Sequence, residues 1–263
     1  MDLRGRRLTA VFAHPDDESF GPGGTLAKYS ARGVEVALVC ATRGEDGSIG
    51  HSKTYGPALL GRIRQAELEA AVEVLGIRRL HLLGYPDRHV ASVALERGTD
   101  DVLAMLREGE PEVVITFHPS GISGHTDHQA VTAFTVRAVE RLQEEARGDR
   151  ADWRSRLRLH FYTIPASVAR QVTYRELPLV PDEDLTIALD TSAYAEVKRR
   201  AIFCHKTQIA FYERLVSMPG PDGRFAIERY VTHGAPRRPE GSPLGDDLFA
   251  GVPDALAPAE PGR

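Results

Sequence analysis

Two short segments of this sequence combine imidazole and carboxylate side chains at spacings of about one helical turn. The first covers residues 13–18 (AHPDDE) and the second residues 124–128 (GHTDH). Each directly follows an apolar run that is typical of a buried β-strand. Together they offer three candidate metal ligands, with a carboxylate and an imidazole to spare. A metal-dependent hydrolase needs these groups.

The ligand set that we infer consists of His14, Asp17 and His128. Pro15 cannot continue a strand, so the chain is expected to turn there and to aim His14 and Asp17 at one point. Catalytic zinc typically takes three nitrogen or oxygen ligands from the protein and keeps a further position for water. We therefore expect one Zn²⁺ per chain, although the same ligands also suit Fe²⁺, Co²⁺ or Mn²⁺.

The remaining polar side chains of the two segments suit acid–base chemistry. Zinc lowers the pKa of a bound water to about 7, and the unligated Asp16 is the expected general base on that water. His125 is expected to act as an acid or electrophilic partner for the developing oxyanion. Asp127 is expected to hold His125 in its protonated or correctly oriented form. Either segment alone is also typical of a surface turn or ion pair, but their shared position after strands favours a site.

Strands and helices alternate along the chain. Apolar runs predict strands at residues 8–13, 34–41, 80–83 and 112–117, and further strands at 157–164 and 185–189, the last at a sheet edge. Helices are predicted at residues 25–32, 59–75, 101–107, 128–147 and 193–205. This pattern predicts an α/β fold, a Rossmann-like and mostly parallel sheet flanked by helices. Ligands of such sheets bind beyond the carboxyl ends of the strands, where both segments lie.

Length and composition suit a single domain with a short extension. The 263 residues are 42% hydrophobic and 27% charged, which is ordinary for a globular protein. We expect one domain over residues 1–234. Residues 235–263 are rich in proline and glycine and predict a smaller C-terminal extension, an extended tail anchored by Leu248 and Phe249.

Charge and hydropathy exclude several classes of protein. A formal net charge of −4 and a pI near 6.2 do not favour nucleic-acid binding. No apolar stretch approaches the length of a membrane span, and the N-terminal apolar run is too short for a signal peptide. The two cysteines, Cys40 and Cys204, form no metal motif; a disulfide is possible in principle, but reduced thiols are expected. We therefore expect a cytoplasmic protein.

At these residues the chain resembles the LmbE-like, or PIG-L, family of zinc-dependent de-N-acetylases. The resemblance covers about residues 8 to 210 and is carried chiefly by the AHPDDE and GHTDH segments. Further similar segments lie at residues 42–45, 64–68, 75–76, 84–87 and 205–208. One departure is Arg88-His89, which follows Asp87 where the family often has a small residue.

The resemblance implies the roles given above, with zinc on His14, Asp17 and His128. It also implies that Glu45, Arg64 and Asp87 contact the substrate, often through sugar hydroxyls. The alternatives are plain turn positions for Glu45 and Asp87, and an ion pair with Glu67 for Arg64.

The expected reaction is hydrolysis of a linear amide, which removes an acetyl group from an N-acetylglucosamine-type conjugate. A precursor of bacillithiol or mycothiol is the first candidate, and the expected partners are this small molecule and other copies of the chain in a homo-oligomer. One alternative is a nucleotide-binding module, because residues 21–24 (GPGG) lie between a strand and a helix. Another is a non-catalytic metal-binding relative, against which the spare carboxylate of Asp16 argues.

Overall fold

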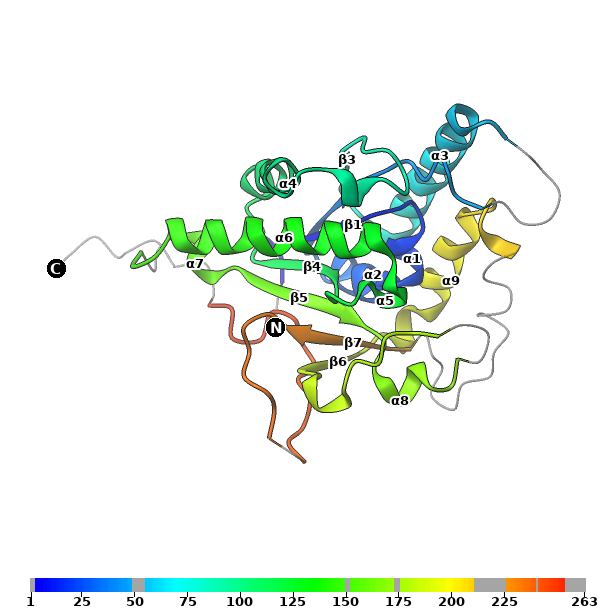
Figure 1. Cartoon of the computed structure of the whole chain (residues 1–263). Coiled ribbons are helices and arrows are strands. Elements are labelled where there is room, and N and C mark those ends of the chain that lie inside the picture. Colours follow the sequence, from blue (N-terminus) through cyan, green and yellow to red (C-terminus); the bar gives the residue numbers. More distant parts are fainter. Residues whose placement is uncertain are drawn as a thin grey trace.

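A seven-stranded sheet with the order β3-β2-β1-β4-β5-β7-β6 runs through the middle of the molecule (Figure 1). The computed structural model describes residues 3–48, 55–149, 152–172, 176–210, 226–239 and 241–253. The parallel strands are β1 (Arg7–Phe12), β2 (Glu35–Cys40), β3 (Arg79–Leu82), β4 (Val113–Phe117) and β5 (Arg158–Thr163). β7 (Ile227–Thr232) runs antiparallel between β5 and β6 (Ile187–Asp190). The predicted α/β fold with a mostly parallel sheet is confirmed.

Helices cover both faces of this sheet (Figure 1). Their bounds are α1 (Asp17–Phe20), α2 (Gly23–Ala31), α3 (Pro57–Leu75), α4 (Leu95–Gly109), α5 (Gly121–Gly124), α6 (Thr126–Glu145), α7 (Trp153–Arg156), α8 (Ala166–Ala169) and α9 (Ala195–Cys204). Short 3-10 turns cover Val90–Ser92, Asp182–Asp184 and Ser192–Tyr194. The β1–β2–β3 connections run in one direction along the sheet, and β3–β4–β5 run in the other. Because such crossovers are right-handed, α2 and α3 lie on one face and α4 and α6 on the other. α9 packs against α2 and α3.

The strand order reverses between β1 and β4, which are hydrogen-bonded neighbours. Every residue of β4 is buried, as expected for a strand covered by helices on both faces. The AHPDDE segment leaves the carboxyl end of β1, and the GHTDH segment follows β4. A reversal of this kind opens a crevice at the sheet edge, and it is the usual ligand site of such folds.

The sequence analysis did not predict β7. Its buried face carries Glu228 and Tyr230 in place of aliphatic residues, so no apolar run marks the strand. The predicted edge strand is confirmed as β6. The helix predicted at residues 101–107 is longer than expected, since α4 begins at Leu95.

The described part of the C-terminal extension packs on the domain. Leu248 and Phe249 are buried, so their predicted anchoring is confirmed. The Tyr29 hydroxyl donates to Asp247 Oδ1 at 2.7 Å and accepts the Leu248 N–H at 2.7 Å. The boundary at residue 234 stays a prediction. Cys40 and Cys204 are both free thiols. Within the described ranges, no helix has the length and apolar character needed to cross a membrane.

Candidate metal centre

The loop after β1 brings His14 and Asp17 together. The His14 N–H donates to Asp17 Oδ2 at 2.8 Å, which closes the turn that Pro15 begins. Between them, Asp16 has a φ of 119°, a positive value that non-glycine residues rarely adopt. Such a conformation costs about 1–3 kcal/mol and persists only where its surroundings hold it.

Three side-chain atoms converge in front of this loop. His14 Nδ1 lies 3.2 Å from His128 Nε2. Asp17 Oδ2 lies 3.5 Å from His14 Nδ1, and Asp17 Oδ1 lies 3.4 Å from His128 Nε2. Donors placed 2.0–2.1 Å from a tetrahedral zinc ion are about 3.3 Å apart. The three sequence-predicted ligands therefore lie at the spacing that one such ion requires.

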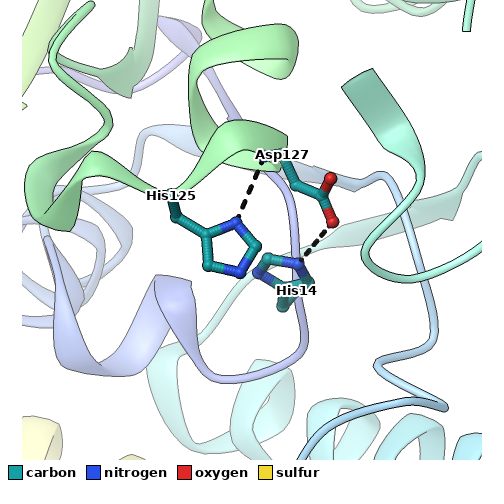
Figure 2. Close-up of side chains that lie close together, drawn as sticks. All are labelled: His14, His125 and Asp127. Atoms are coloured by element: carbon teal, nitrogen blue, oxygen red, sulfur yellow. Dashed lines mark hydrogen bonds and ion pairs between the residues drawn. The ribbon is translucent and has the colours of Figure 1, made fainter. Parts of the chain in front are cut away.

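The other nitrogen of each imidazole has its own partner. His14 Nε2 lies 3.2 Å from Asp127 Oδ2 and 3.2 Å from Asp87 Oδ1 (Figure 2 shows the first contact). His128 Nδ1 lies 3.1 Å from the carbonyl oxygen of Gly121, a residue with a φ of +74°. Metal-binding histidines are commonly oriented in this way, with the second nitrogen donating to a carboxylate or a carbonyl. The partners thus leave Nδ1 of His14 and Nε2 of His128 free for a metal.

The protonation states of the ligand set also suit a cation. Burial lowers the pKa of His128 to about 4, so its imidazole is neutral, as a metal ligand must be. Although burial opposes the charged form, His128 and His14 hold the pKa of Asp17 well below its usual value. Burial alone would lower the pKa of His14, but hydrogen bonds to Asp127, Asp17 and Asp87 raise it, so His14 must release a proton when its Nδ1 binds a metal.

A second group of potential ligand atoms, from His14, His125 and Asp127, also lies within 4.8 Å. This group would need His14 Nε2, which already contacts the carboxylates of Asp127 and Asp87. The nitrogen and oxygen donors of His14, Asp17 and His128 fit a borderline divalent ion such as zinc, and they fit it without breaking those contacts.

Asp16 lies beside the ligands and is bonded to Arg64. Arg64 Nη2 lies 3.0 Å from Asp16 Oδ2. Burial raises the pKa of Asp16 to about 6, although the positive charge of Arg64 opposes the shift. Arg64, expected to contact substrate, is itself buried, and Glu67 instead accepts hydrogen bonds from Thr207 at 2.7 and 2.8 Å. The alternative interpretation of Arg64, an ion pair with Glu67, is thus not among the contacts that the structure shows for these two residues.

His125 and Asp127 meet in a different way from the one expected. The Asp127 backbone N–H donates to His125 Nδ1 at 3.2 Å, while the Asp127 carboxylate contacts His14 (Figure 2). Because Nδ1 accepts this hydrogen bond, the proton of the neutral imidazole is on Nε2. Burial and the nearby His14 lower the pKa of His125. The side chain is therefore a neutral donor rather than a cation held by Asp127.

Asp87 and Glu45 take up different places around the centre. Asp87 lines the same cavity as the ligands, and its contact with His14 was not foreseen from the sequence. Glu45 lies behind Asp87, where its Oε1 accepts the Asp87 N–H at 3.0 Å, and it lines a separate hollow. These contacts depend on how loops distant in the sequence pack against each other, so no local sequence pattern could have revealed them.

The cavity in front of the ligands has a volume of about 350 Å³. Its polar side includes His14, Asp16, Asp17, His125 and His128, and its apolar side includes Phe20, Phe117, Ile122, Tyr162 and Ile164. A polar reaction centre beside an apolar wall is the usual make-up of a small-molecule site.

A buried pair beneath the loop was missed by the sequence analysis. His205 Nε2 lies 2.7 Å from Glu18 Oε1, and Glu18 Oε2 accepts the Asp16 N–H at 3.0 Å. All three side chains are buried. The only signal in the sequence was the presence of Glu18 and His205 in family-like segments. Because Glu18 accepts the Asp16 N–H, the pair is a structural support for the backbone of Asp16.

The glycine-rich segment 21–24 does not offer a phosphate site. The N–H groups of Gly24 and Thr25 donate to the two carboxylate oxygens of Glu228 at 2.9 and 2.8 Å. A phosphate needs such free N–H groups at a helix N-terminus. The protein's own carboxylate occupies this position, and the nucleotide-binding alternative is not supported.

Comparison with known proteins identifies the family. The model of the PIG-L family, described as GlcNAc-PI de-N-acetylase, matches residues 9–139. A 1D-myo-inositol 2-acetamido-2-deoxy-alpha-D-glucopyranoside deacetylase of Streptomyces griseus is 32% identical over 97% of this chain and 91% of its own length. The chain belongs to the PIG-L family. Its PIG-L relatives include an enzyme of the same name from Saccharomonospora viridis, which is 34% identical over 86% of this chain and 90% of the relative.

Solved structures share the PIG-L fold. N,N'-diacetylchitobiose deacetylase from Pyrococcus horikoshii has a TM-score of 0.64 and 21% identity, with 86% of this chain and 83% of that chain covered. GalB, the 4-carboxy-2-hydroxymuconate hydratase from Pseudomonas putida, has a TM-score of 0.63 and 20% identity over 90% of this chain and 100% of that chain. The fold thus occurs with two chemistries, so the reaction must be argued from the site.

Proposed function

We propose that this chain is a metal-dependent deacetylase that hydrolyses the amide of an N-acetylglucosamine-type conjugate. The observation that carries the proposal is the triangle of His14 Nδ1, His128 Nε2 and the Asp17 carboxylate, with edges of 3.2 to 3.5 Å. The unligated carboxylate of Asp16 beside it distinguishes a catalytic centre from a structural one, which needs no spare base and usually closes with four protein ligands.

Zinc is the metal that we propose for these ligands; when bound, it supplies Lewis-acid chemistry by lowering the pKa of water and polarising a carbonyl oxygen. Asp16 accepts the proton of the attacking water. Its pKa of about 6 suits this exchange near neutral pH. The protonated Asp16 then passes the proton to the leaving amine. Arg64 holds the carboxylate of Asp16 in place, at 3.0 Å.

His125 stabilises the negative charge that develops on the carbonyl oxygen. Its Nδ1 accepts the Asp127 N–H, so Nε2–H is the group available for donation. A neutral donor aimed at the oxyanion is worth several kcal/mol in known acyl-transfer enzymes, about 3–4 for one group. Asp127 contributes indirectly, because its carboxylate orients His14 at 3.2 Å.

The substrate class comes from the relatives. Two of them are named as deacetylases of an inositol glycoside of N-acetylglucosamine. A mycothiol precursor of this kind is therefore favoured over a bacillithiol precursor. We assign Asp87 to the substrate-contacting wall, because it lines the cavity. Arg64 lines the same cavity, whereas Glu45 lies behind Asp87. Direct contact of Arg64 or Glu45 with sugar hydroxyls, like a homo-oligomeric state and a cytoplasmic location, remains a prediction.

An amine-release screen tests the reaction and the substrate together. Zinc-loaded protein is incubated with a panel of N-acetylglucosaminides, including the inositol glycoside, and the free amine is measured. We expect release from at least the inositol glycoside, and loss of release after chelation. Metal-loaded protein that releases no amine from any of the panel would contradict the proposal and favour a non-catalytic relative.

A further inference from the structure

The outer surface of α3 and α9 carries a groove that the proposed reaction does not use. α9 packs alongside α3, and the groove between the two helices has a volume of about 710 Å³ (Figure 1). Its apolar lining includes Ile63, Ala66, Ala70 and Val74 from α3 and Phe203 from α9. These residues are different from those that line the cavity of the metal centre. The groove is therefore a separate surface of the molecule.

The solvent side of α3 carries a continuous apolar stripe. The stripe consists of Leu59, Ile63, Ala66, Ala70 and Val74. Steps of three and four residues place these side chains on one helical face, and each of them is exposed or half-buried. Among the described residues only four large hydrophobic side chains are exposed, and two of them lie at this surface, Leu59 at 43% and Phe203 at 41%. A contiguous exposed apolar surface of this kind marks an interaction site.

Charged side chains border one edge of the stripe in a directional order. Arg62 lies in the first half of α3, whereas Glu69 and Glu73 lie in the second half, and all three are exposed. With about 3.6 residues per turn, they fall on the edge of the stripe that is away from α9. Glu67 falls on the other edge, where it accepts hydrogen bonds from Thr207 just after α9. The free edge of the stripe is thus positive toward the start of the helix and negative toward its end.

This pattern is complementary to itself when the helix is turned end to end. A two-fold axis beside Ala66 sets two copies of α3 antiparallel, with their free edges together. Ile63 of one copy then faces Ala70 of the other, so that a large side chain packs over a small one, as close helix packing requires. Arg62 of each copy comes to lie between Glu69 and Glu73 of the other. Shape and charge therefore both favour a second copy of this chain as the occupant.

We propose that the apolar stripe and its bordering charges form the contact surface of a homodimer, in which α3 of one copy packs antiparallel on α3 of a second copy. Two-fold dimers are the commonest oligomers of soluble proteins, and their contact surfaces are self-complementary. The contact covers the groove and places opposite charges from the two chains side by side, which fixes the register of the two helices. The proposal does not depend on the proposed deacetylase function.

Sedimentation equilibrium of the full chain, from about 1 to 100 μM, tests the contact. The wild type is expected to reach the mass of two chains. Ala70→Arg places a charge in the middle of the stripe at an exposed helical position, and it should raise the Kd of the dimer by about a hundredfold. Glu108→Arg, at an exposed position of α4, is the control and should keep the wild-type Kd. A monomeric wild type, or a dimer that Ala70→Arg does not weaken, overturns the proposal.

A charge exchange tests the antiparallel register. Arg62→Glu brings carboxylates together at two symmetric positions of the dimer and should raise the Kd by about tenfold or more. The paired change Glu69→Arg with Glu73→Arg should weaken the dimer in the same way. Combining all three substitutions restores opposite charges, so the Kd should return to within about threefold of the wild-type value. A triple variant as weak as the separate variants would contradict the antiparallel pairing.

A covalent link provides a measurement that needs no weakened variant. Ala66 lies beside the proposed two-fold axis, so Ala66→Cys in a Cys204→Ser background should form a disulfide-linked dimer under mild oxidation. Glu108→Cys in the same background is the control and should stay unlinked. Far-UV circular dichroism checks that each variant is folded. A folded Ala66→Cys protein that sediments as a dimer but forms no link would reject the α3 contact.

Discussion

Asp16 is held in its unusual conformation by contacts on both sides of its peptide. Glu18 accepts its N–H at 3.0 Å, and Arg64 bonds its carboxylate at 3.0 Å and the preceding Pro15 carbonyl at 2.6 Å. His205 in turn fixes Glu18 at 2.7 Å. The side chain of the proposed base is therefore positioned independently of any metal, which is how preorganised acid–base groups work.

Asp16→Asn provides the first prediction. The amide keeps the size of the side chain but cannot take up the water proton, so kcat should fall by about 10²–10⁴-fold. The metal content should stay at the wild-type level, because Asp16 is not one of the inferred ligands. Asp46→Asn, at an exposed carboxylate in the next loop, is the matched control. Unchanged kcat in Asp16→Asn would contradict the assigned role.

For the individual site residues, the sequence indicated which side chains lie close together but not how those side chains are oriented. His14, Asp17 and His128 follow predicted strands, and strand ends at one edge of a sheet are close by necessity. The direction of the Asp127 carboxylate was mispredicted. It points to His14, which is 113 residues away in the chain, and local spacing carries no information about that orientation.

Among the elements, β7 and α9 are joined to the start of α2 by a buried ion pair. Lys198 Nζ lies 2.6 Å from Glu228 Oε1 and donates to the Gly21 carbonyl at 2.7 Å. Both side chains are about 1% exposed. Glu228 also accepts the Gly24 and Thr25 N–H groups in the first turn of α2, so one carboxylate satisfies two donors of a helix end that would otherwise attract an anion.

Lys198→Met tests the energetic role of this pair. Removing the ammonium leaves Glu228 buried with its charge only partly compensated, and the free energy of unfolding should fall by about 3 kcal/mol. Urea denaturation measures the change. Arg199→Ala, which breaks an exposed pair with Glu196 on the same helix, should cost less than about 1 kcal/mol. Equal losses in the two variants would show that the buried pair adds nothing.

The elements themselves were mostly predictable, for a reason visible in their sequences. The runs that became β1, β2 and β4 are continuous and apolar because both faces of a parallel strand are covered. β7 escaped prediction because its inward positions hold Glu228 and Tyr230, whose polar atoms are satisfied by Lys198 and Thr25. Only long-range partners make such a strand stable, and a single sequence does not display them.

For the whole molecule, the described C-terminal residues Leu248, Phe249 and Val252 pack into the hydrophobic core of the domain. Arg6 Nη1 contacts Glu112 Oε1 at 2.8 Å and the Pro253 carbonyl at 2.9 Å. On β5, His160 Nε2 lies 3.0 Å from the Leu248 carbonyl, and its Nδ1 lies 3.0 Å from Thr232 Oγ1. This arrangement fits a neutral imidazole that donates from Nε2 and accepts at Nδ1.

His160 predicts how stability depends on pH. Burial lowers its pKa to about 4 in the folded protein, whereas an unfolded chain takes up the proton near pH 6.5. The contribution of neutral His160 to the free energy of unfolding is therefore complete above about pH 7. As the pH falls toward 4, up to about 3 kcal/mol of this stability is lost. Unfolding free energies should show a flatter fall from pH 7 to 4 in His160→Gln than in the wild type. Parallel curves for both proteins would contradict the assignment.

The most direct test of the account is metal stoichiometry measured together with amide hydrolysis, in the wild type and in Asp17→Asn and His128→Gln variants. The three donors lie 3.2 to 3.5 Å apart, so we predict one divalent ion per wild-type chain and its loss, with the activity, in both variants. Zinc should restore activity to chelated wild-type protein. Variants that bind one ion and release amine at the wild-type rate would contradict the central claim.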